Sequence, residues 1–345
     1  MAEPLLRVED LRTYLYLNEG VVRAVNGVSF TIDRGQTMAL VGESGSGKSV
    51  VAQSIMRILP DRARIEEGRI LFSVEGGPPV DLAALPANGK AMRAIRGGAI
   101  GMVFQEPMTS FSPVHTIGDQ IGETVRLHRG ASRPEARATA VEMLKAVGFP
   151  DPTRKVNAYP FELSGGLRQR AMIAMALACR PALLIADEPT SALDVTIQAQ
   201  ILMLLQQLQQ EYGMALLIIT HDPGVVAYVA DFVTVMYCGK VMETGPITTL
   251  FEVPQHPYLQ ALLRSTPQFG LAADERLPAI PGAVPGPLVR IRGCPFLGRC
   301  PEGEPDPCDL AMPALRAFAP DHHVACYKRG SVPETMPGAR GPERL

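Results

Sequence analysis

The sequence lacks three features that mark other classes of protein. Its 345 residues hold 33 Lys and Arg against 35 Asp and Glu, so the basic excess of a nucleic-acid-binding domain is missing. No apolar run approaches the roughly 20 residues that cross a bilayer. The start, MAEPLLR, lacks the basic stretch and apolar core of a secretory signal. We therefore expect a chain on the cytoplasmic side that binds no nucleic acid and reaches a membrane only through a partner.

The most informative feature present is a glycine-rich loop. The apolar run Met38–Val41 leads into the octet GESGSGKS, residues Gly42–Ser49, which fits the P-loop pattern G-x-x-x-x-G-K-[ST]. Glycines let backbone N–H groups converge on an anion, and the helix that follows adds the positive end of its dipole. The loop therefore predicts binding of a nucleoside triphosphate with Mg²⁺. The expected phosphate and metal contacts are Gly42, Ser44, Gly45, Gly47, Lys48 and Ser49.

A pair of acids follows a second apolar run. Leu183–Ala186 has the length of a buried strand and ends in Asp187 and Glu188. Ligands of open α/β sheets lie at the carboxyl ends of strands, so we expect both acids beside the P-loop. Asp187 is then placed to hold Mg²⁺ through water, and Glu188 to orient or deprotonate an attacking water.

A second possible anion site lies between these motifs. Leu163–Gln169 reads LSGGLRQ and precedes a helical run, so Ser164 caps a helix start at which two glycines expose backbone donors. Here the chain resembles the ATP-binding cassette (ABC) family, whose signature is LSGGxxQ. In that family the signature of one subunit closes over ATP held by another. The resemblance implies a second ABC ATPase subunit, whose nucleotide would meet Ser164, Gly165, Gly166 and Gln169.

Other motifs of the family occur in the same order in this sequence. The resemblance implies that Gln105, in VFQEP, reaches Mg²⁺ and the water, and that Asp194, in SALD, lies in the loop at the dimer interface. It also implies that His221, after the run Ile218–Thr220, contacts the γ-phosphate. Adenine would stack on an aromatic ring near the first strand. The usual position falls on Leu15, and of its neighbours Tyr14 and Tyr16 we favour Tyr16.

These patterns predict an α/β fold of the P-loop NTPase class, an ABC nucleotide-binding domain. Alternating apolar residues in Val21–Val25 and Val28–Ile32 indicate an antiparallel edge sheet. We expect the domain to span residues 1–255, with a helical subdomain at about 106–180. From Pro267 onward, prolines and glycines indicate an irregular, cysteine-rich extension within residues 256–345.

Four of the six cysteines lie in this extension, spaced C-x5-C-x7-C-x17-C. Two disulfides are not expected in a reducing compartment, whereas a metal can order a segment that has little core. The alternatives are a [4Fe–4S] cluster, Zn²⁺, or thiols without metal. Structural zinc sites usually contain a close C-x2–4-C pair, which is missing here, so the cluster is favoured. The ligands would be Cys294, Cys300, Cys308 and Cys326.

The extension resembles that of the dipeptide/oligopeptide permease ATPases. The resemblance rests on GCPFLGRCP, residues Gly293–Pro301, on Ile280–Pro285 and on His256–Tyr258. It implies the [4Fe–4S] cluster and an ABC importer of the peptide or nickel type. The implied partners are a related ATPase subunit, commonly in a heterodimer, two transmembrane permease subunits and, indirectly, an extracytoplasmic substrate-binding protein. Such an ATPase lies on the cytoplasmic face of the cell membrane.

Two other functions remain open from the sequence. One is a soluble ABC ATPase that acts on DNA or the ribosome, although the long coiled coil or second cassette of such proteins is not seen. The other is an ATPase that the C-terminal cluster controls as a redox or iron sensor.

Overall fold

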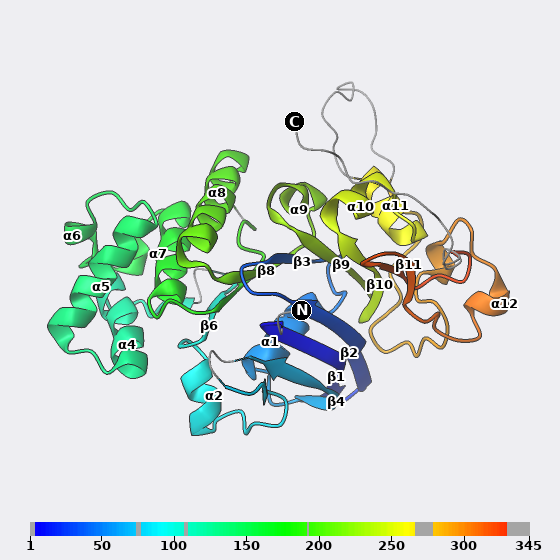
Figure 1. The fold of residues 1–345 in the computed structure, drawn as a ribbon, viewed down its shortest axis with the longest axis horizontal. Coiled ribbons are helices and arrows are strands. Elements are labelled where there is room, and N and C mark those ends of the chain that lie inside the picture. Colours follow the sequence, from blue (N-terminus) through cyan, green and yellow to red (C-terminus); the bar gives the residue numbers. More distant parts are fainter. Residues whose placement is uncertain (1–3, 74–76, 107–109, 192, 266–278, 330–345) are drawn as a thin grey trace.

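The computed structural model describes residues 4–73, 77–106, 110–191, 193–265 and 279–329. Two sheets form its framework (Figure 1). The smaller sheet is antiparallel, with strand order β2-β1-β4-β5, as the alternating segments predict. Its strands are β1 (Leu6–Leu17), β2 (Gly20–Ile32), β4 (Ala63–Phe72) and β5 (Val80–Asp81).

The larger sheet has the order β11-β12-β10-β9-β3-β8-β7-β6. Strands β9, β3, β8, β7 and β6 are parallel to one another. Every residue of β3, β7 and β8 is buried, as expected for strands covered on both faces. The strands are β3 (Thr37–Val41), β6 (Ile100–Val103), β7 (Leu183–Asp187), β8 (Ala215–Thr220), β9 (Phe232–Tyr237), β10 (Lys240–Pro246), β11 (Arg316–Ala319) and β12 (His322–Val324).

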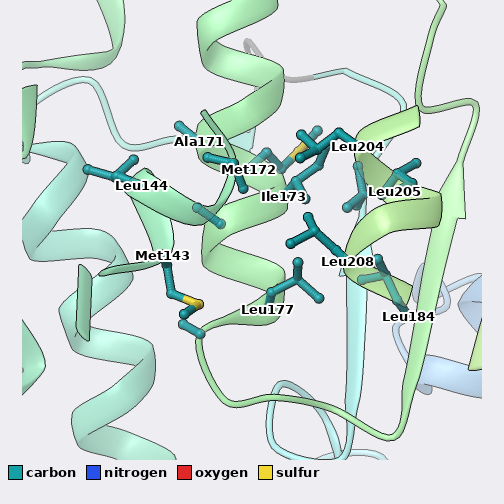
Figure 2. Packing of buried hydrophobic residues seen from close by; sticks show 14 of the residues in the cluster. Met143, Leu144, Ala171, Met172, Ile173, Leu177, Leu184, Leu204, Leu205 and Leu208 are labelled. Carbon is teal, nitrogen blue, oxygen red and sulfur yellow. The ribbon is translucent and has the colours of Figure 1, made fainter. Parts of the chain in front are cut away.

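Helices gather at one end of the molecule in a helical subdomain (Figure 1). Thr116 caps α4 by accepting a hydrogen bond from the Asp119 N–H, and Ser132 and Glu135 form a capping box at α5. Apolar side chains of α5, α7, α8 and β7 pack together into one core (Figure 2). The helices here are α4 (Ile117–Arg129), α5 (Arg133–Ala146), α6 (Pro152–Lys155), η1 (Pro160–Glu162), α7 (Gly165–Leu177) and α8 (Val195–Tyr212).

The remaining helices flank the two sheets. The helix that follows the P-loop is α1 (Lys48–Met56), and α9 begins directly after β8. Among the described residues, no helix combines the length and apolar character needed to cross a membrane. The bounds are α2 (Lys90–Ile95), α9 (Pro223–Val229), α10 (Ile247–Glu252), α11 (Pro257–Arg264), η2 (Leu297–Arg299) and α12 (Pro305–Cys308).

The C-terminal segment is largely irregular over 279–315, but it then joins the large sheet. Strand β12 pairs with β10, so that Glu243 lies opposite Val324. The buried Glu243 carboxylate accepts hydrogen bonds from the backbone N–H groups of Gln255 and His256 and lies 2.7 Å from His322 Nε2. The C-terminal segment is therefore anchored in the large sheet. Residues 266–278 and 330–345 of the extension lie outside the described residues.

Candidate functional site

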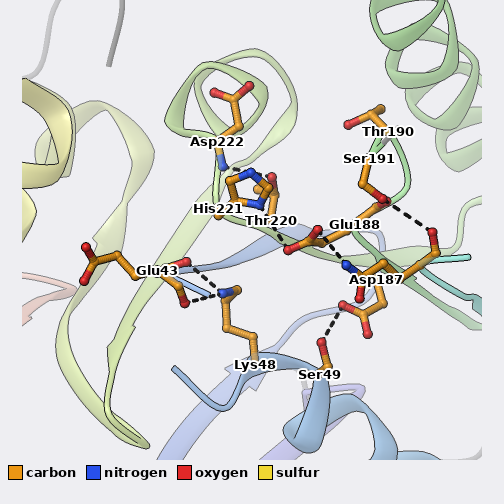
Figure 3. Close-up of polar contacts among 12 residues, drawn as sticks. Glu43, Lys48, Ser49, Asp187, Glu188, Thr190, Ser191, Thr220, His221 and Asp222 are labelled. Atoms are coloured by element: carbon orange, nitrogen blue, oxygen red, sulfur yellow. Dashed lines mark hydrogen bonds and ion pairs between the residues drawn. The ribbon is translucent and has the colours of Figure 1, made fainter. Parts of the chain in front are cut away.

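The P-loop turns from β3 into α1 as the sequence predicts. Gly47 has a left-handed φ of 98°, and a β-carbon on it would lie 2.0 Å from the Ala24 carbonyl oxygen. Only glycine fits this position. The Lys48 ammonium group donates hydrogen bonds to the carbonyl oxygens of Gly42 (2.7 Å) and Glu43 (2.9 Å), which hold it against the loop (Figure 3). Burial lowers the pKa of Lys48.

Two acids meet the loop at the carboxyl end of β7. The Ser49 hydroxyl donates to Asp187 Oδ1 over 3.0 Å. Glu188 Oε2 accepts from the Gln105 amide at 3.1 Å, and His221 Nδ1 lies 3.0 Å from Glu188 Oε1 (Figure 3). Residues that follow β3, β6, β7 and β8 therefore converge at one edge of the sheet, because parallel strands bring their carboxyl ends together.

The donor groups at this edge suit a hard cation. Ser49 offers a hydroxyl oxygen and Asp187 a carboxylate, which are the ligand types that Mg²⁺ prefers. Burial raises the pKa of Asp187, because removal from water disfavours the charged carboxylate. Glu188 has a φ of 46°, which non-glycine residues seldom adopt and which occurs often at functional sites. These residues fit a bound Mg²⁺ next to the P-loop.

The structure separates the two tyrosines considered for the base. The Tyr14 hydroxyl donates a hydrogen bond to Asn26 Oδ1 on β2 at 3.2 Å. The Arg23 guanidinium lies over the Tyr14 ring, 5.6 Å from the ring centroid. Tyr16 instead turns to β4, where it donates to Glu66 at 2.8 Å. Strand β2 passes the P-loop and β4 lies on the opposite side of β1. Tyr14 therefore lies against the strand that passes the P-loop and Tyr16 against β4, and the stacking of Tyr16 on adenine stays a prediction.

Comparisons with known proteins agree with this geometry. Residues 25–191 match the family described as ABC transporter, and residues 242–308 match the family described as oligopeptide/dipeptide transporter, C-terminal region. A putative peptide import ATP-binding protein of Brucella abortus (strain 2308) is 52% identical over 94% of this chain and 97% of its own length. The dipeptide transport ATP-binding protein DppD of Escherichia coli (strain K12) is 44% identical over 94% and 96%.

This chain belongs to the ABC transporter family. Among solved structures, it resembles a dimeric post-hydrolysis state of an ATP-binding cassette bound to ADP and Pi. That similarity has a TM-score of 0.61 and 28% identity over 70% of this chain and 98% of the other. The chain is therefore an ABC ATPase, and a soluble ABC ATPase acting on DNA or the ribosome is not favoured.

The ABC signature lies at the start of α7, within the helical subdomain. The Ser164 hydroxyl accepts from the Leu167 N–H and caps the helix, as predicted. A β-carbon on Gly166 would lie 3.2 Å from Ile197 on α8, so the signature packs against the start of that helix. Asp194 caps α8 through the Ile197 N–H, whereas Gln169 is buried within the chain.

Two residues of the motifs that we identified are not described. Pro107 follows Gln105 in VFQEP, and Ala192 belongs to the SALD segment; both lie outside the described residues. Ser191 in the same segment donates its hydroxyl to the Glu188 carbonyl oxygen at 2.9 Å. This bond connects the expected dimer-interface loop to the acid at the end of β7.

Sequence reasoning missed an ion pair between the extension and the P-loop. Arg299 donates to both carboxylate oxygens of Glu43, at 2.6 and 3.1 Å, and its side chain is only 6% exposed. The pair raises the pKa of Arg299. The Tyr258 hydroxyl accepts from the Glu43 N–H at 2.8 Å. Glu43 occupies an unspecified position of the P-loop pattern, so the motif itself gives no signal for this contact.

The four C-terminal cysteines line one small pocket, together with His256 and Glu302. All four are free thiols. Burial raises the pKa of Cys294 to about 11 and also raises that of Cys300. In the described part of the chain, no three His, Cys, Asp or Glu side chains are grouped to hold a single metal ion. The four cysteines therefore share a pocket but lack the close grouping that a single metal ion requires, and the [4Fe–4S] cluster stays a prediction.

Proposed function

We propose that this ABC ATPase powers an importer of peptides. The observation that carries the proposal is the convergence of Lys48, Ser49, Asp187, Glu188 and His221 at one edge of the sheet. ATP hydrolysis needs this combination of phosphate cradle, metal ligands and acid. Relatives named as peptide import or dipeptide transport ATP-binding proteins, together with the C-terminal region of that transporter family, support peptides as the cargo class.

The proposed chemistry assigns one task to each side chain. Lys48 and the backbone N–H groups of the P-loop bind the phosphates. Mg²⁺ held by Ser49 and, through water, by Asp187 would neutralise charge on the β- and γ-phosphates. Glu188 accepts the proton of the attacking water. Gln105 and His221 orient Glu188 through hydrogen bonds to its two different oxygens, and His221 is available to the γ-phosphate.

The second half of the site would come from a partner ATPase subunit. Ser164, Gly165 and Gly166 expose helix N-terminal donors that suit a γ-phosphate. The dimeric cassette bound to ADP and Pi supports this arrangement. We infer a heterodimer with a related chain, docked on two permease subunits at the cytoplasmic face of the membrane and served by an extracytoplasmic binding protein.

We further propose that the chain has a nucleotide-binding domain in residues 1–255 and an extension in residues 256–345 that holds a [4Fe–4S] cluster. The four cysteines share a pocket, and a cluster suits them because it keeps its ligand sulfurs farther apart than one ion does. Bound iron and sulfide would give anaerobically purified protein a visible absorption band that Cys300→Ser removes. Stoichiometric zinc, or protein free of metal, would contradict the cluster.

Peptide uptake tests the proposed cargo directly. Cells that carry Glu188→Gln in place of the native chain should lose uptake of labelled di- or oligopeptides and keep uptake of the corresponding free amino acids. A matched control is Glu211→Gln, because Glu211 is an exposed acid near the end of α8. Unchanged peptide uptake in the Glu188→Gln cells would refute the proposed cargo.

A further inference from the structure

An open pocket of about 470 Å³ lies directly beside the P-loop. Four segments supply most of its lining, and three of them precede the C-terminal extension. These three are β2, through Val22, Arg23, Ala24 and Asn26, the P-loop, through Ser44 and Gly45, and the turn between β9 and β10, through Cys238–Lys240. The fourth is residues 284–293 of the C-terminal extension, which we call the strap. The pocket has the volume of a typical small-molecule site.

Backbone contacts fix the β2 wall against the P-loop. The Asn26 N–H donates to the Gly239 carbonyl oxygen, and the Gly239 N–H donates to the Ser46 carbonyl oxygen, both at 2.9 Å. The Ala24 carbonyl oxygen also lies against Gly47. The position of β2 relative to a ligand bound at the P-loop is therefore fixed by these contacts.

The strap is held on both sides of the pocket. A β-carbon on Gly20, the first residue of β2, would lie 3.3 Å from Leu288 Cδ2, and one on Gly293 would lie 2.1 Å from the Cys308 carbonyl oxygen. Within the strap, the Val289 N–H donates to the Gly286 carbonyl oxygen at 3.0 Å. The strap thus has its own turn and packs closely at two points.

The lining combines two kinds of surface. The P-loop contributes Ser44 and Gly45, next to its anion cradle, whereas Val22 and the strap residues Val289 and Ile291 present apolar surface. Val289 is 60% exposed, so a ligand could bury it. Arg292 of the strap also lines the pocket and adds a positive charge. A molecule with a polyanionic end and a flat, largely apolar body matches this combination.

We propose that the strap forms one wall of the nucleoside pocket, so that the C-terminal extension contributes directly to ATP binding. The base and ribose would lie between β2 and the strap while the phosphates occupy the P-loop. This inference rests on the proposed ATP binding. It makes Val289 and Ile291 determinants of nucleoside affinity, although both lie more than 200 residues from the P-loop in sequence.

Titration calorimetry with Mg·ATP and with magnesium and inorganic triphosphate separates the two parts of the pocket. In Val289→Ser/Ile291→Ser, we expect ATP to bind at least about tenfold more weakly, because loss of contact with one methyl group at each position, at roughly fourfold each, already gives about a sixteenfold loss. Triphosphate, which has no nucleoside, should bind as it does to the wild type. Leu315→Ser, a partly exposed position of the extension outside the pocket, is the matched control.

The outcomes distinguish the inference from the function on which it rests. Unchanged ATP affinity in the double variant, or an equal loss for ATP and triphosphate, would overturn the strap as a nucleoside wall and leave the ATPase assignment standing. If the wild type binds neither ATP nor triphosphate, both the strap inference and the ATPase assignment are refuted. Val289→Ser alone, at an exposed position, should give part of the loss and provides a test if the double variant fails to fold.

Discussion

Replacing Arg299 with alanine removes the cation that joins the C-terminal extension to the P-loop. Arg299 makes two hydrogen bonds to Glu43, at 2.6 and 3.1 Å, and the side chains are 6% and 24% exposed. Breaking a buried ion pair costs about 3–5 kcal/mol because it leaves one charge unpaired. Glu43 retains some access to water, so we expect the free energy of unfolding to fall by about 2–3 kcal/mol.

A destabilisation of this size should be visible in thermal unfolding. In domains of 150–250 residues each kcal/mol lowers Tm by roughly 2–4 °C, so we expect Arg299→Ala to lower it by about 5 °C. A double-mutant cycle with Glu43→Gln isolates the pair, and the two changes together should cost clearly less than their sum. A Tm within about 1 °C of the wild type, or strictly additive effects, would refute the role assigned to this contact.

Two further predictions concern the nucleotide site. Gly47→Ala should weaken binding of inorganic triphosphate more than about a hundredfold in calorimetry, because its β-carbon would lie 2.0 Å from the Ala24 carbonyl oxygen. The control variant Gly77→Ala should bind triphosphate as the wild type does, because Gly77 has open space around it. Cys238 should react with iodoacetamide about a hundredfold more slowly at pH 8 than an exposed thiol, since burial raises its pKa to about 11. Its rate, followed by peptide mass mapping, should rise about tenfold per pH unit up to that pKa, and a rate already level at pH 9 would contradict the raised pKa.

The nucleotide site could be predicted from sequence because each of its residues follows a short apolar run. Asp187, Glu188 and His221 each end or follow a buried parallel strand, and parallel strands of one sheet end at the same edge. Local patterns and one topological rule were therefore sufficient. The same holds for Ser164 and Asp194, whose helix caps depend on contacts three residues away.

The remaining features depend on contacts that no local pattern encodes. Glu43 and Arg299 are 256 residues apart. Each lies in a segment that the sequence identifies, the P-loop octet and Gly293–Pro301, but neither segment predicts a contact with the other. The different neighbours of Tyr14 and Tyr16 accompany a register shift in β1, which occurs between Thr13 and Leu15 in its pairing with β2. A bulge of this kind re-aims side chains that simple alternation would place on one face.

The most direct test of the central claim compares the wild type with Glu188→Gln in the presence of Mg·ATP. If Glu188 accepts the proton of the attacking water, the variant should bind ATP as tightly as the wild type and retain it uncleaved, with hydrolysis reduced at least about a hundredfold. Hydrolysis by the variant at the wild-type rate, or loss of ATP binding together with hydrolysis, would contradict the account.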